Sequence, residues 1–551
     1  MTYPRIEVGL SEITHKPFVG ERKMAAGTVN LDALVPRDDF NMDDEGSMGN
    51  LRSTISLTDL DNGFFSNSLR KPDFQRETTN WSPQKIVDLV KAFLDGDLIP
   101  AVILWQRGSR VFAIDGAHRL SALMAWLKDD YGDGVSSIKF FGPNIPDEQL
   151  KIAEKTRKLM KNEVGRYAEF QAMSTHLAEL SSEVQAKVAR LGSNSLVAQW
   201  VTKTDPRAAE ASFFKINQAA QPIDTTERRI LQSRQAANGI AARCIVRAGK
   251  GHKYWASFNP EAQGQIEEVG NKIFEALYTP ALREPIKTLD MPVAGQGYNA
   301  LPFIFNLVNL CNDLPLPKSA SDKKIVNPLA DDVDGTETLA FLKKVEKRIS
   351  LVTTNHPGSL GFHPAVYFYA MSGKFLANAF LASLEFAKEL DQRRKKNEFC
   401  EVRGDFENYL FQNKVYISLT VTKLGSGARS LTRLKDLYWR IFEYFSEGLQ
   451  PEEITERLFN DQSFSHLRAS EVPPPHVSHG KSSSGRQSGA TKSAAYIREG
   501  MANVIRCSIC EGAIHANSLS SDHVTRVEDG GGGHSSNAGI AHPYCNTGFK
   551  N

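Results

Sequence analysis

The sequence lacks the features of membrane and secreted proteins. No run of eighteen apolar residues occurs among its 551, and residues 301–310, the longest candidate, reach about half that length. The N-terminus lacks the charged-then-apolar order of a secretory signal. Six cysteines are too few for a disulfide scaffold in a chain of this length and favour a reducing compartment. We therefore expect a cytoplasmic protein without membrane contact.

An excess of charge of either sign is also missing. The 66 basic and 64 acidic residues leave a formal net charge of +2, so no global field draws the chain to nucleic acid. Any such contact must come from local patches. Hydrophobic residues make up 41% and charged residues 24%, as in ordinary globular proteins. The length predicts three or four domains, at about 150 residues each.

The cysteines are unevenly placed. Cys244, Cys311 and Cys400 stand alone, which is typical of buried small apolar side chains. The other three fall near the end of the chain, in the pairs Cys507-x2-Cys510 and His542-x2-Cys545. Three thiolates and one imidazole make a closed tetrahedral shell for structural zinc, which would supply folding energy to a module of about 55 residues. The alternative is three free thiols.

Polar residues between and beside these pairs suggest hydrolytic chemistry. They are Asp522, His523, Asn537 and Asn546. A carboxylate and an amide oxygen can hold Mg²⁺ or Mn²⁺, and a neighbouring imidazole can deprotonate a water. Metal, base and positioned water are what phosphodiester hydrolysis needs.

Together these residues resemble the zinc-bound form of the HNH (ββα-metal) nuclease family. The resemblance covers about 506–551 and implies that His523 is the general base. It also implies that Asp522 and Asn546 ligate the catalytic divalent ion, and that Asn537 braces the loop orienting His523. His542 stands where the family usually has cysteine, and we expect the zinc shell to survive this change. His515 and His534 have no assigned role and are expected to face solvent.

Residues 52–130 have a compact α/β pattern. Apolar spacing predicts a helix over 83–94, with Ser82 as N-cap, Pro83 in the first turn and Gly96 as a stop signal. Short strands are expected at 54–57, 101–105 and 110–114, the last two forming a hairpin, followed by a helix over 117–128.

A possible anion site follows that hairpin. Asp115 ends a strand, Gly116 permits a sharp turn, and the next helix offers free N–H groups to a phosphate. Arg119 can add a bidentate phosphate contact, and Asp115 can bind a metal-phosphate or position a water. The simpler interpretation is an N-cap aspartate with a surface arginine.

The surrounding order of motifs resembles one known domain. It runs Pro72-Asp73-Phe74-Gln75-Arg76, Trp81, a helix, Ile99-Pro100, a hairpin and Ile114-Asp115-Gly116-Ala117-His118-Arg119, and later Phe213-Phe214-Lys215-Ile216-Asn217 with Pro222. This order is similar to the ParB/sulfiredoxin-like N-terminal domain of GmrSD-type modification-dependent restriction proteins.

That resemblance implies a nucleotide-phosphate site. It would contain Asp115, Gly116 and Arg119, with Gln75 and Arg76 beside it and Asn217 approaching it. His118 matches the Asp-Gly-Gln-His-Arg variant of sulfur-modification proteins and is given a role. Ala117 replaces a polar residue of the family, so nucleotide binding without hydrolysis remains an alternative.

The sequence as a whole predicts an α+β multidomain protein. We expect an arm over 1–50, the ParB/sulfiredoxin-like α/β domain over 51–235, a mainly helical domain over 236–470, a flexible linker over 471–495, and a small ββα-metal zinc module over 496–551.

The predicted function is a DNA endonuclease of an anti-phage restriction system. A nucleoside triphosphate or modified phage DNA would be sensed by the N-terminal domain, which controls the nuclease. Double-strand cutting by one nuclease per chain would favour a homo-oligomer. The alternatives are a nucleotide-gated DNA-binding regulator without cleavage, and an NTPase for which the C-terminal module is only a DNA anchor.

Overall fold

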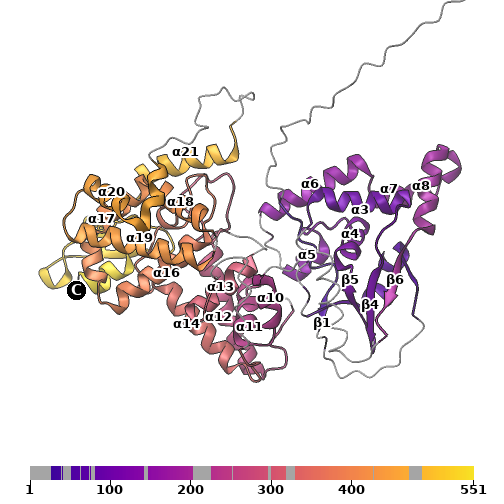
Figure 1. Cartoon of the computed structure of the whole chain (residues 1–551), viewed down its shortest axis with the longest axis horizontal. Coiled ribbons are helices and arrows are strands. Elements are labelled where there is room, and N and C mark those ends of the chain that lie inside the picture. The colour runs from indigo at the N-terminus through magenta and orange to yellow at the C-terminus, as the bar shows by residue number, and fades with distance from the viewer. Residues whose placement is uncertain are drawn as a thin grey trace, which may run out of the picture.

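The structure of the protein is a computed structural model. The structure describes residues 27–38, 40, 51–61, 64–73, 75, 78, 81–141, 145, 147–202, 225–250, 252–295, 300–317, 329–425, 427–470 and 487–550. These residues form a mixed α/β domain and a larger helical body that carries the C-terminal elements (Figure 1). No helix in these ranges is long and apolar enough to cross a membrane.

The N-terminal domain is built on a mixed six-stranded sheet in the order β1-β3-β5-β4-β6-β2. The strands are β1 (Arg37–Asp38), β2 (Thr54–Ser56), β3 (Leu69–Pro72), β4 (Val102–Arg107), β5 (Arg110–Asp115) and β6 (Ser195–Trp200). β3 is parallel to β1 and β5, and β4 is antiparallel to β5 but parallel to β6. β2 pairs antiparallel with β6. The expected hairpin is confirmed as β4–β5.

Side chains of β5 alternate between the two faces of this sheet. Val111 and Ala113 join the main core of the domain. Phe112 and Ile114 point to the opposite face, where they form a second cluster with Trp105. The alternation follows the two-residue period of a strand. Because both faces are apolar, the strand that ends at Asp115 is held firmly in place.

Helices of this domain lie above and beside the strands in Figure 1. They are α1 (Leu57–Asp61), α2 (Phe64–Ser68), α3 (Pro83–Asp95), α4 (Ala117–Lys128), α5 (Val135–Phe141), α6 (Asp147–Glu163), α7 (Tyr167–Ser174) and α8 (Ser182–Ser193). The predicted signals of α3 are confirmed. The Ser82 hydroxyl accepts the Lys85 N–H at 3.3 Å, and Gly96 ends the helix at a φ of 80°.

Part of the expected N-terminal arm is built into this domain. Val29, Leu31 and Val35 are buried in its core, and Val29 N donates to Trp81 O at 2.8 Å. Residues 27–38 are therefore attached to the domain, since their apolar side chains fill its core. The rest of 1–50, apart from Phe40, lies outside the described residues.

The helical body contains α10 (Thr225–Gln232), α11 (Ala237–Val246), α12 (Pro260–Tyr278), α13 (Leu301–Cys311), α14 (Thr336–Ser350), α15 (Pro364–Tyr367), α16 (Ala377–Gln392), α17 (Lys396–Gln412), α18 (Val415–Leu424), α19 (Ala428–Ser446) and α20 (Pro451–Asn460). A dense aromatic group lies at its centre, where Phe386 contacts Phe362, Phe399 and Phe442. The mainly helical character predicted for this region is confirmed.

The C-terminal module comprises residues 487–550. It contains α21 (Gly489–Ala502), the strands β7 (Ser520–His523) and β8 (Ala538–Ala541), and a helical turn at Cys545–Phe549. Most of the predicted linker, 471–486, lies outside the described residues, but its last part is helical in α21. Eight residues of the module, among them Ile497 and Met501 of α21, belong to the same buried core as the helical body. The other six are Cys507, Cys510, Ala513, Ile514, Ala541 and Cys545.

Candidate functional site

Two short turns bring the C-terminal cysteines together. Cys507 and Cys510 lie on a tight turn, where Cys507 N donates to Gly512 O at 2.9 Å and Glu511 N donates to Cys507 O at 3.0 Å. Cys545 opens the helical turn that follows β8, and His542 directly follows that strand. Ser508 N, in the first turn, donates to Ile540 O of β8 at 3.0 Å, and β8 pairs antiparallel with β7, so both turns belong to one small unit.

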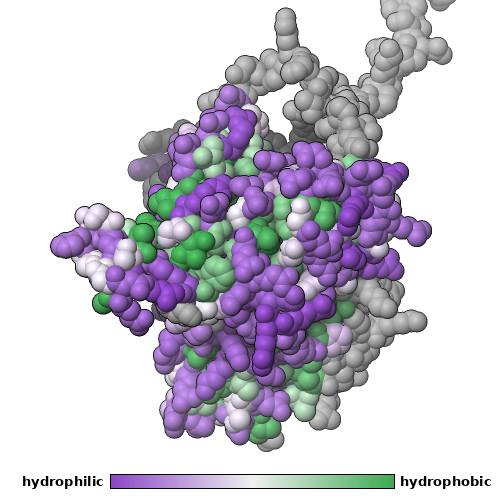
Figure 2. Space-filling model, turned by 90° about the vertical axis from the view of Figure 1, so that its left-hand side faces the viewer, coloured by the Kyte–Doolittle hydropathy of each residue, from purple (hydrophilic) through white to green (hydrophobic). Residues whose placement is uncertain are grey.

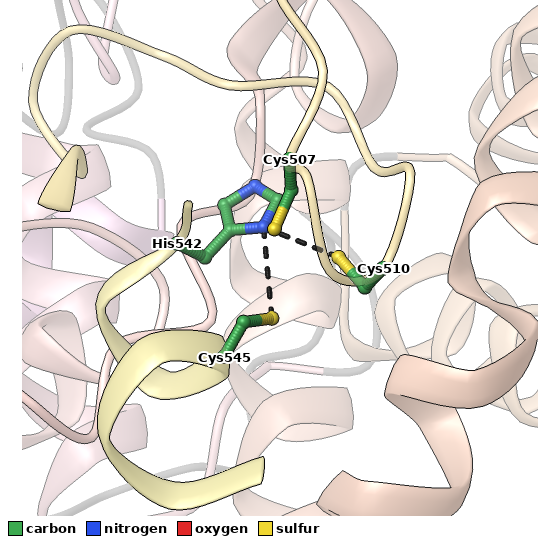
Figure 3. A group of neighbouring side chains, drawn as sticks. All are labelled: Cys507, Cys510, His542 and Cys545. Atoms are coloured by element: carbon green, nitrogen blue, oxygen red, sulfur yellow. Dashed lines mark hydrogen bonds between the residues drawn. The ribbon is translucent and has the colours of Figure 1, made fainter. Parts of the chain in front are cut away.

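The four predicted ligands meet at one buried point (Figure 3). Their candidate ligand atoms all lie within 4.8 Å of one another, and His542 Nδ1 is 3.3 Å from Cys510 Sγ and 3.9 Å from Cys545 Sγ. None of the four side chains is more than 5% exposed. The cluster predicted from the spacing is confirmed, and a three-sulfur, one-nitrogen donor set fits a closed structural zinc site.

A backbone carbonyl fixes the orientation of the imidazole. His542 Nε2 lies 3.1 Å from Ala513 O, so the proton resides on Nε2, which donates to the carbonyl. The unprotonated Nδ1 then faces the sulfurs. Outer contacts of this kind orient histidine ligands in metal sites.

A buried ion pair on α17 supports the same peptide. Arg403 Nε donates to Glu407 Oε1 at 2.7 Å, and Glu407 Oε2 accepts the Ala513 N–H at 2.6 Å. Arg403 also donates to the carbonyls of Leu360 and Gly361. Burial by itself lowers the pKa of Arg403, but the Glu407 carboxylate and the nearby thiols raise it well above its ordinary value. The helical body therefore supplies part of the outer shell of the cluster.

Cys400, also on α17, lies beside the cluster. Its Sγ is 3.7 Å from Cys545 Sγ, and the residue is buried. Cys244 and Cys311 are buried as well, as predicted for lone cysteines. The sequence contains no spacing signal that links Cys400 to residues more than a hundred positions later.

Asp522 and His523 lie on β7, next to the helical turn. Asp522 is 6% exposed, and Lys550 Nζ lies 2.8 and 3.0 Å from its two oxygens. His523 is exposed on the same strand. Asn546 Nδ2 donates to Ser520 Oγ at 2.8 Å and to Ser521 O at 3.0 Å. The predicted base and the two predicted ligands thus belong to one strand and the turn packed beside it.

Asn537 closes the loop between the two strands. Its Oδ1 accepts the Thr525 N–H at 2.7 Å, and its Nδ2 donates to Thr525 O at 3.0 Å and to Gly532 O at 2.9 Å. The backbone after His523 is held by these contacts. His534 is exposed, as expected.

The expectation that His515 faces solvent is wrong. His515 is 3% exposed, and its ring lies 5.4 Å from that of His363, centroid to centroid, in an edge-to-face arrangement. Burial lowers its pKa to about 4. The module packs against the helical body along this side, which a loop position in the sequence did not reveal.

Figure 2 shows the molecule from the end formed by the helical body and the module. Hydrophilic side chains cover most of this face, with smaller apolar groups between them. The exposed apolar residues of the module include Val524 and Val527, in the loop between its two strands.

The second predicted site lies at the end of β5. Arg119 Nη2 contacts Asp115 Oδ2 at 2.6 Å and donates to Ala101 O at 3.2 Å. Gly116 has a φ of 95°, and a Cβ there would lie 2.6 Å from Val102 Cγ1, so a side chain at this turn would be strained and crowded. Asp115, Gly116 and Arg119 are thus adjacent.

Other predicted residues flank this turn. Gln75 Nε2 lies 3.5 Å from Ile114 O, and the His118 ring stacks on Trp81 with 5.6 Å between centroids. Lys85 Nζ lies over the same Trp81 ring, 4.9 Å from its centroid. Arg76 and Asn217 lie outside the described residues.

The helical body touches the N-terminal domain close to this turn. Tyr254 donates to Asp73 O at 3.1 Å, and Arg234 lies 3.4 Å from the Asp73 carboxylate. Nearby, Asp32 pairs with Lys71 at 2.6 Å and with Arg247 of the helical body at 3.7 Å. Burial alone raises the pKa of Asp32, but the surrounding cations hold it far below its usual range. The junction is therefore polar, buried and charged.

Comparison with known proteins identifies the N-terminal region. Residues 57–233 match the family model described as GmrSD restriction endonuclease, N-terminal domain. The expected resemblance to the GmrSD N-terminal domain is confirmed over these residues and suggests a restriction-system nuclease, while the ParB/sulfiredoxin-like fold stays a prediction. No curated protein and no solved structure matches the chain.

Proposed function

We propose that the protein is a DNA endonuclease of an anti-phage restriction system, with an HNH-type metal-dependent nuclease centre in the C-terminal module. The observation that carries this proposal is the placement of Asp522 and His523 on β7, beside the turn that bears Asn546, in a unit joined by the Cys3His cluster. The GmrSD match at 57–233 independently favours DNA as substrate.

Each residue of the proposed centre has a distinct task. Asp522 and Asn546 would hold a Mg²⁺ or Mn²⁺ ion, which lowers the pKa of bound water and neutralises charge on a phosphodiester. His523 is exposed to solvent, so it can reach a water at the scissile phosphate and take its proton. Asn537 holds the loop after His523 through three hydrogen bonds.

Structural zinc belongs to the same proposal. Cys507, Cys510, His542 and Cys545 would hold it, since their donor atoms converge and are shielded from water. Zinc neutralises the thiolates and links the two turns, which sets the distance between β7 and the turn of Asn546. Its role is structural because four protein ligands leave no open position.

The test is cleavage of plasmid DNA by the full chain with Mg²⁺ or Mn²⁺. His523→Ala is expected to abolish cleavage while the fold stays intact, because its side chain is exposed. His534→Ala, which alters another exposed histidine of the same module, is the matched control and should cleave normally. Equal cleavage by His523→Ala and the unaltered protein would refute the assignment of the base. Absence of cleavage in all forms would favour a DNA-binding regulator.

We further propose that the N-terminal domain binds a nucleoside triphosphate or senses modified DNA and thereby controls the nuclease. Asp115, Gly116 and Arg119 form a compact turn at the start of α4, whose N-terminal N–H groups favour phosphate. Gln75 and the stacked pair His118 and Trp81 lie next to it. The contacts of Asp73 with the helical body provide a route by which occupancy of this site could reach the module.

This control is tested with matched modified and unmodified phage DNAs, each with and without nucleotide. Asp115→Asn is expected to remove the dependence of cleavage on nucleotide or on modification and to weaken nucleotide binding at least tenfold. Asp95→Asn, an exposed position at the end of α3, serves as the control. Unchanged binding and unchanged dependence in Asp115→Asn would contradict the proposal.

A further inference from the structure

Lys550 makes the closest charged contacts of the proposed nuclease centre. Its ammonium lies 2.8 and 3.0 Å from the two carboxylate oxygens of Asp522 and also donates to the carbonyl of His523. The Lys550 side chain is 19% exposed and that of Asp522 5%. A single cation thus gathers three oxygens at the point where β7 carries its functional residues.

The helical turn that begins at Cys545 places this ammonium. Lys550 N donates to Cys545 O at 3.0 Å, and Asn546, one turn earlier, contacts the backbone of β7. Residues four positions apart lie on the same side of a helix, so Asn546 and Lys550 both face β7. The position of Lys550 is therefore fixed by the helical turn that begins at Cys545.

The oxygens that bind Lys550 include the carboxylate that the proposed function assigns to a divalent ion. Hard cations such as Mg²⁺ and Mn²⁺ take carboxylate and carbonyl oxygens. An ammonium and a divalent ion at the same carboxylate would repel each other at close range in a partly buried place. The two cations therefore exclude one another from Asp522.

We propose that Lys550 is an internal counter-ion of the nuclease centre, which neutralises Asp522 in the metal-free protein and must leave it before a divalent ion binds. The inference rests on the proposed function, which identifies the metal site. It adds that the Lys550 ammonium competes with the divalent ion for Asp522. Because the Lys550 side chain is partly exposed, it can turn outward to solvent when it is displaced. Lys550 thus acts through Asp522 and weakens the binding of a divalent ion there.

The test measures Mn²⁺ binding to the zinc-loaded full chain by calorimetry, in the absence of DNA. Lys550→Met keeps the length of the side chain but removes its charge, and we expect it to bind Mn²⁺ about tenfold more tightly. Lys550→Arg keeps the charge and should bind as the unaltered protein does. Lys492→Met, at an exposed position of α21, is the control for loss of a lysine. Asp522→Ala should lose the site in either background.

The outcomes separate this inference from the proposed function. Equal Mn²⁺ affinity of Lys550→Met and the unaltered protein overturns the inference, even if His523→Ala still shows that the module cleaves DNA. Tighter binding by Lys550→Met that disappears with Asp522→Ala supports it, even if no cleavage is found. Mn²⁺ binding that survives Asp522→Ala unchanged places the ion elsewhere and also overturns it. Thermal unfolding of each variant checks that the fold is retained.

Discussion

The four side chains of the Cys3His cluster place their donor atoms where one metal ion could bind all of them. His542 is held by Ala513 O so that Nδ1 faces three buried sulfurs. Burying polar donor groups costs free energy unless they gain strong partners, and a metal ion would be such a partner for all four. A metal ion bound by these four residues would therefore contribute directly to the free energy of folding.

We predict that Cys510→Ala removes one zinc per chain. The remaining three ligands leave an open, water-accessible shell that binds zinc more weakly, and the module should lose protection against proteolysis. Elemental analysis of the purified protein gives the stoichiometry. Cys311→Ala also changes a buried cysteine of the shared core but lies outside the cluster, so it should retain its zinc. Equal zinc content in the two variants would contradict this assignment.

The junction between the two bodies should be sensitive to acid through His252. Burial and the neighbouring Arg247 lower its pKa to about 3, below the roughly 6.5 of an unfolded histidine. Between these values the unfolded chain binds a proton that the folded chain does not. The free energy of unfolding therefore falls as the pH drops through this window, by up to about 1.4 kcal/mol per pH unit.

We expect His252→Gln to reduce this acid sensitivity. Chemical denaturation between pH 4 and 7 measures it as a shallower dependence of the unfolding free energy on pH. His176→Gln, at an exposed position of the N-terminal domain, should keep the slope of the unaltered protein. Identical slopes for His252→Gln and the unaltered protein would rule out His252 as the responsible group.

Residues whose roles depend on neighbours in sequence were predictable. Ser82, Gly96 and the adjacency of Asp115 with Arg119 follow from local helix and turn rules, and the structure contains them. The burial of His515 and the approach of Cys400 to Cys545 depend on contacts between distant segments. Spacing carries no information about such contacts.

At the scale of elements, α17 connects the helical body with the C-terminal module. It carries both Arg403 and Glu407, and it also places Asn397 against Tyr544, whose hydroxyl donates to it at 2.6 Å. Its residues Phe399, Phe406 and Leu410 are buried in the core of the helical body. The sequence does not reveal that a buried ion pair on this helix supports a cluster formed by residues of the C-terminal module.

We predict that Glu407→Gln destabilises the protein by about 3 kcal/mol, because it leaves Arg403 buried without its counter-charge. It also replaces the acceptor of the Ala513 N–H, so zinc should pass more rapidly to a competing chelator. Both effects are measurable, by thermal unfolding and by the rate of zinc release. Glu401→Gln alters an exposed carboxylate of the same helix and should change neither. Unaltered zinc release in Glu407→Gln would show that α17 only packs against the module.

In the N-terminal domain, some elements are determined by local sequence signals and others by contacts with distant parts of the chain. The α3 helix and the β4–β5 hairpin are set by signals within a few residues, and both were predicted. β6 enters the sheet beside β4 from a position far along the chain, and β1 comes from the segment expected to be a loose arm. Their pairing is selected by the packed sheet, not by their own short sequences.

For the molecule as a whole, the shared core argues against a module that folds independently and swings on a tether. Ser493 of α21 accepts the Ile286 N–H at 3.0 Å, Leu519 N donates to Asn355 at 2.9 Å, and Tyr544 N donates to Ser359 O at 3.0 Å. These contacts hold three separate parts of the module to the helical body. Control of the nuclease would then act through the packed interface.

The decisive measurement at this scale compares residues 487–551 alone with the full chain. The isolated segment lacks Arg403 and Glu407, so we expect it to bind zinc roughly 10–100-fold more weakly, as loss of outer-shell partners does in other metal sites. Competition with a chromogenic chelator gives the affinity, and circular dichroism reports whether zinc induces structure. Equal affinity and a cooperative thermal transition in the isolated segment would mean that the module folds by itself. In that case the helical body would be only a docking surface, and release of the nuclease from it would become the simpler means of control.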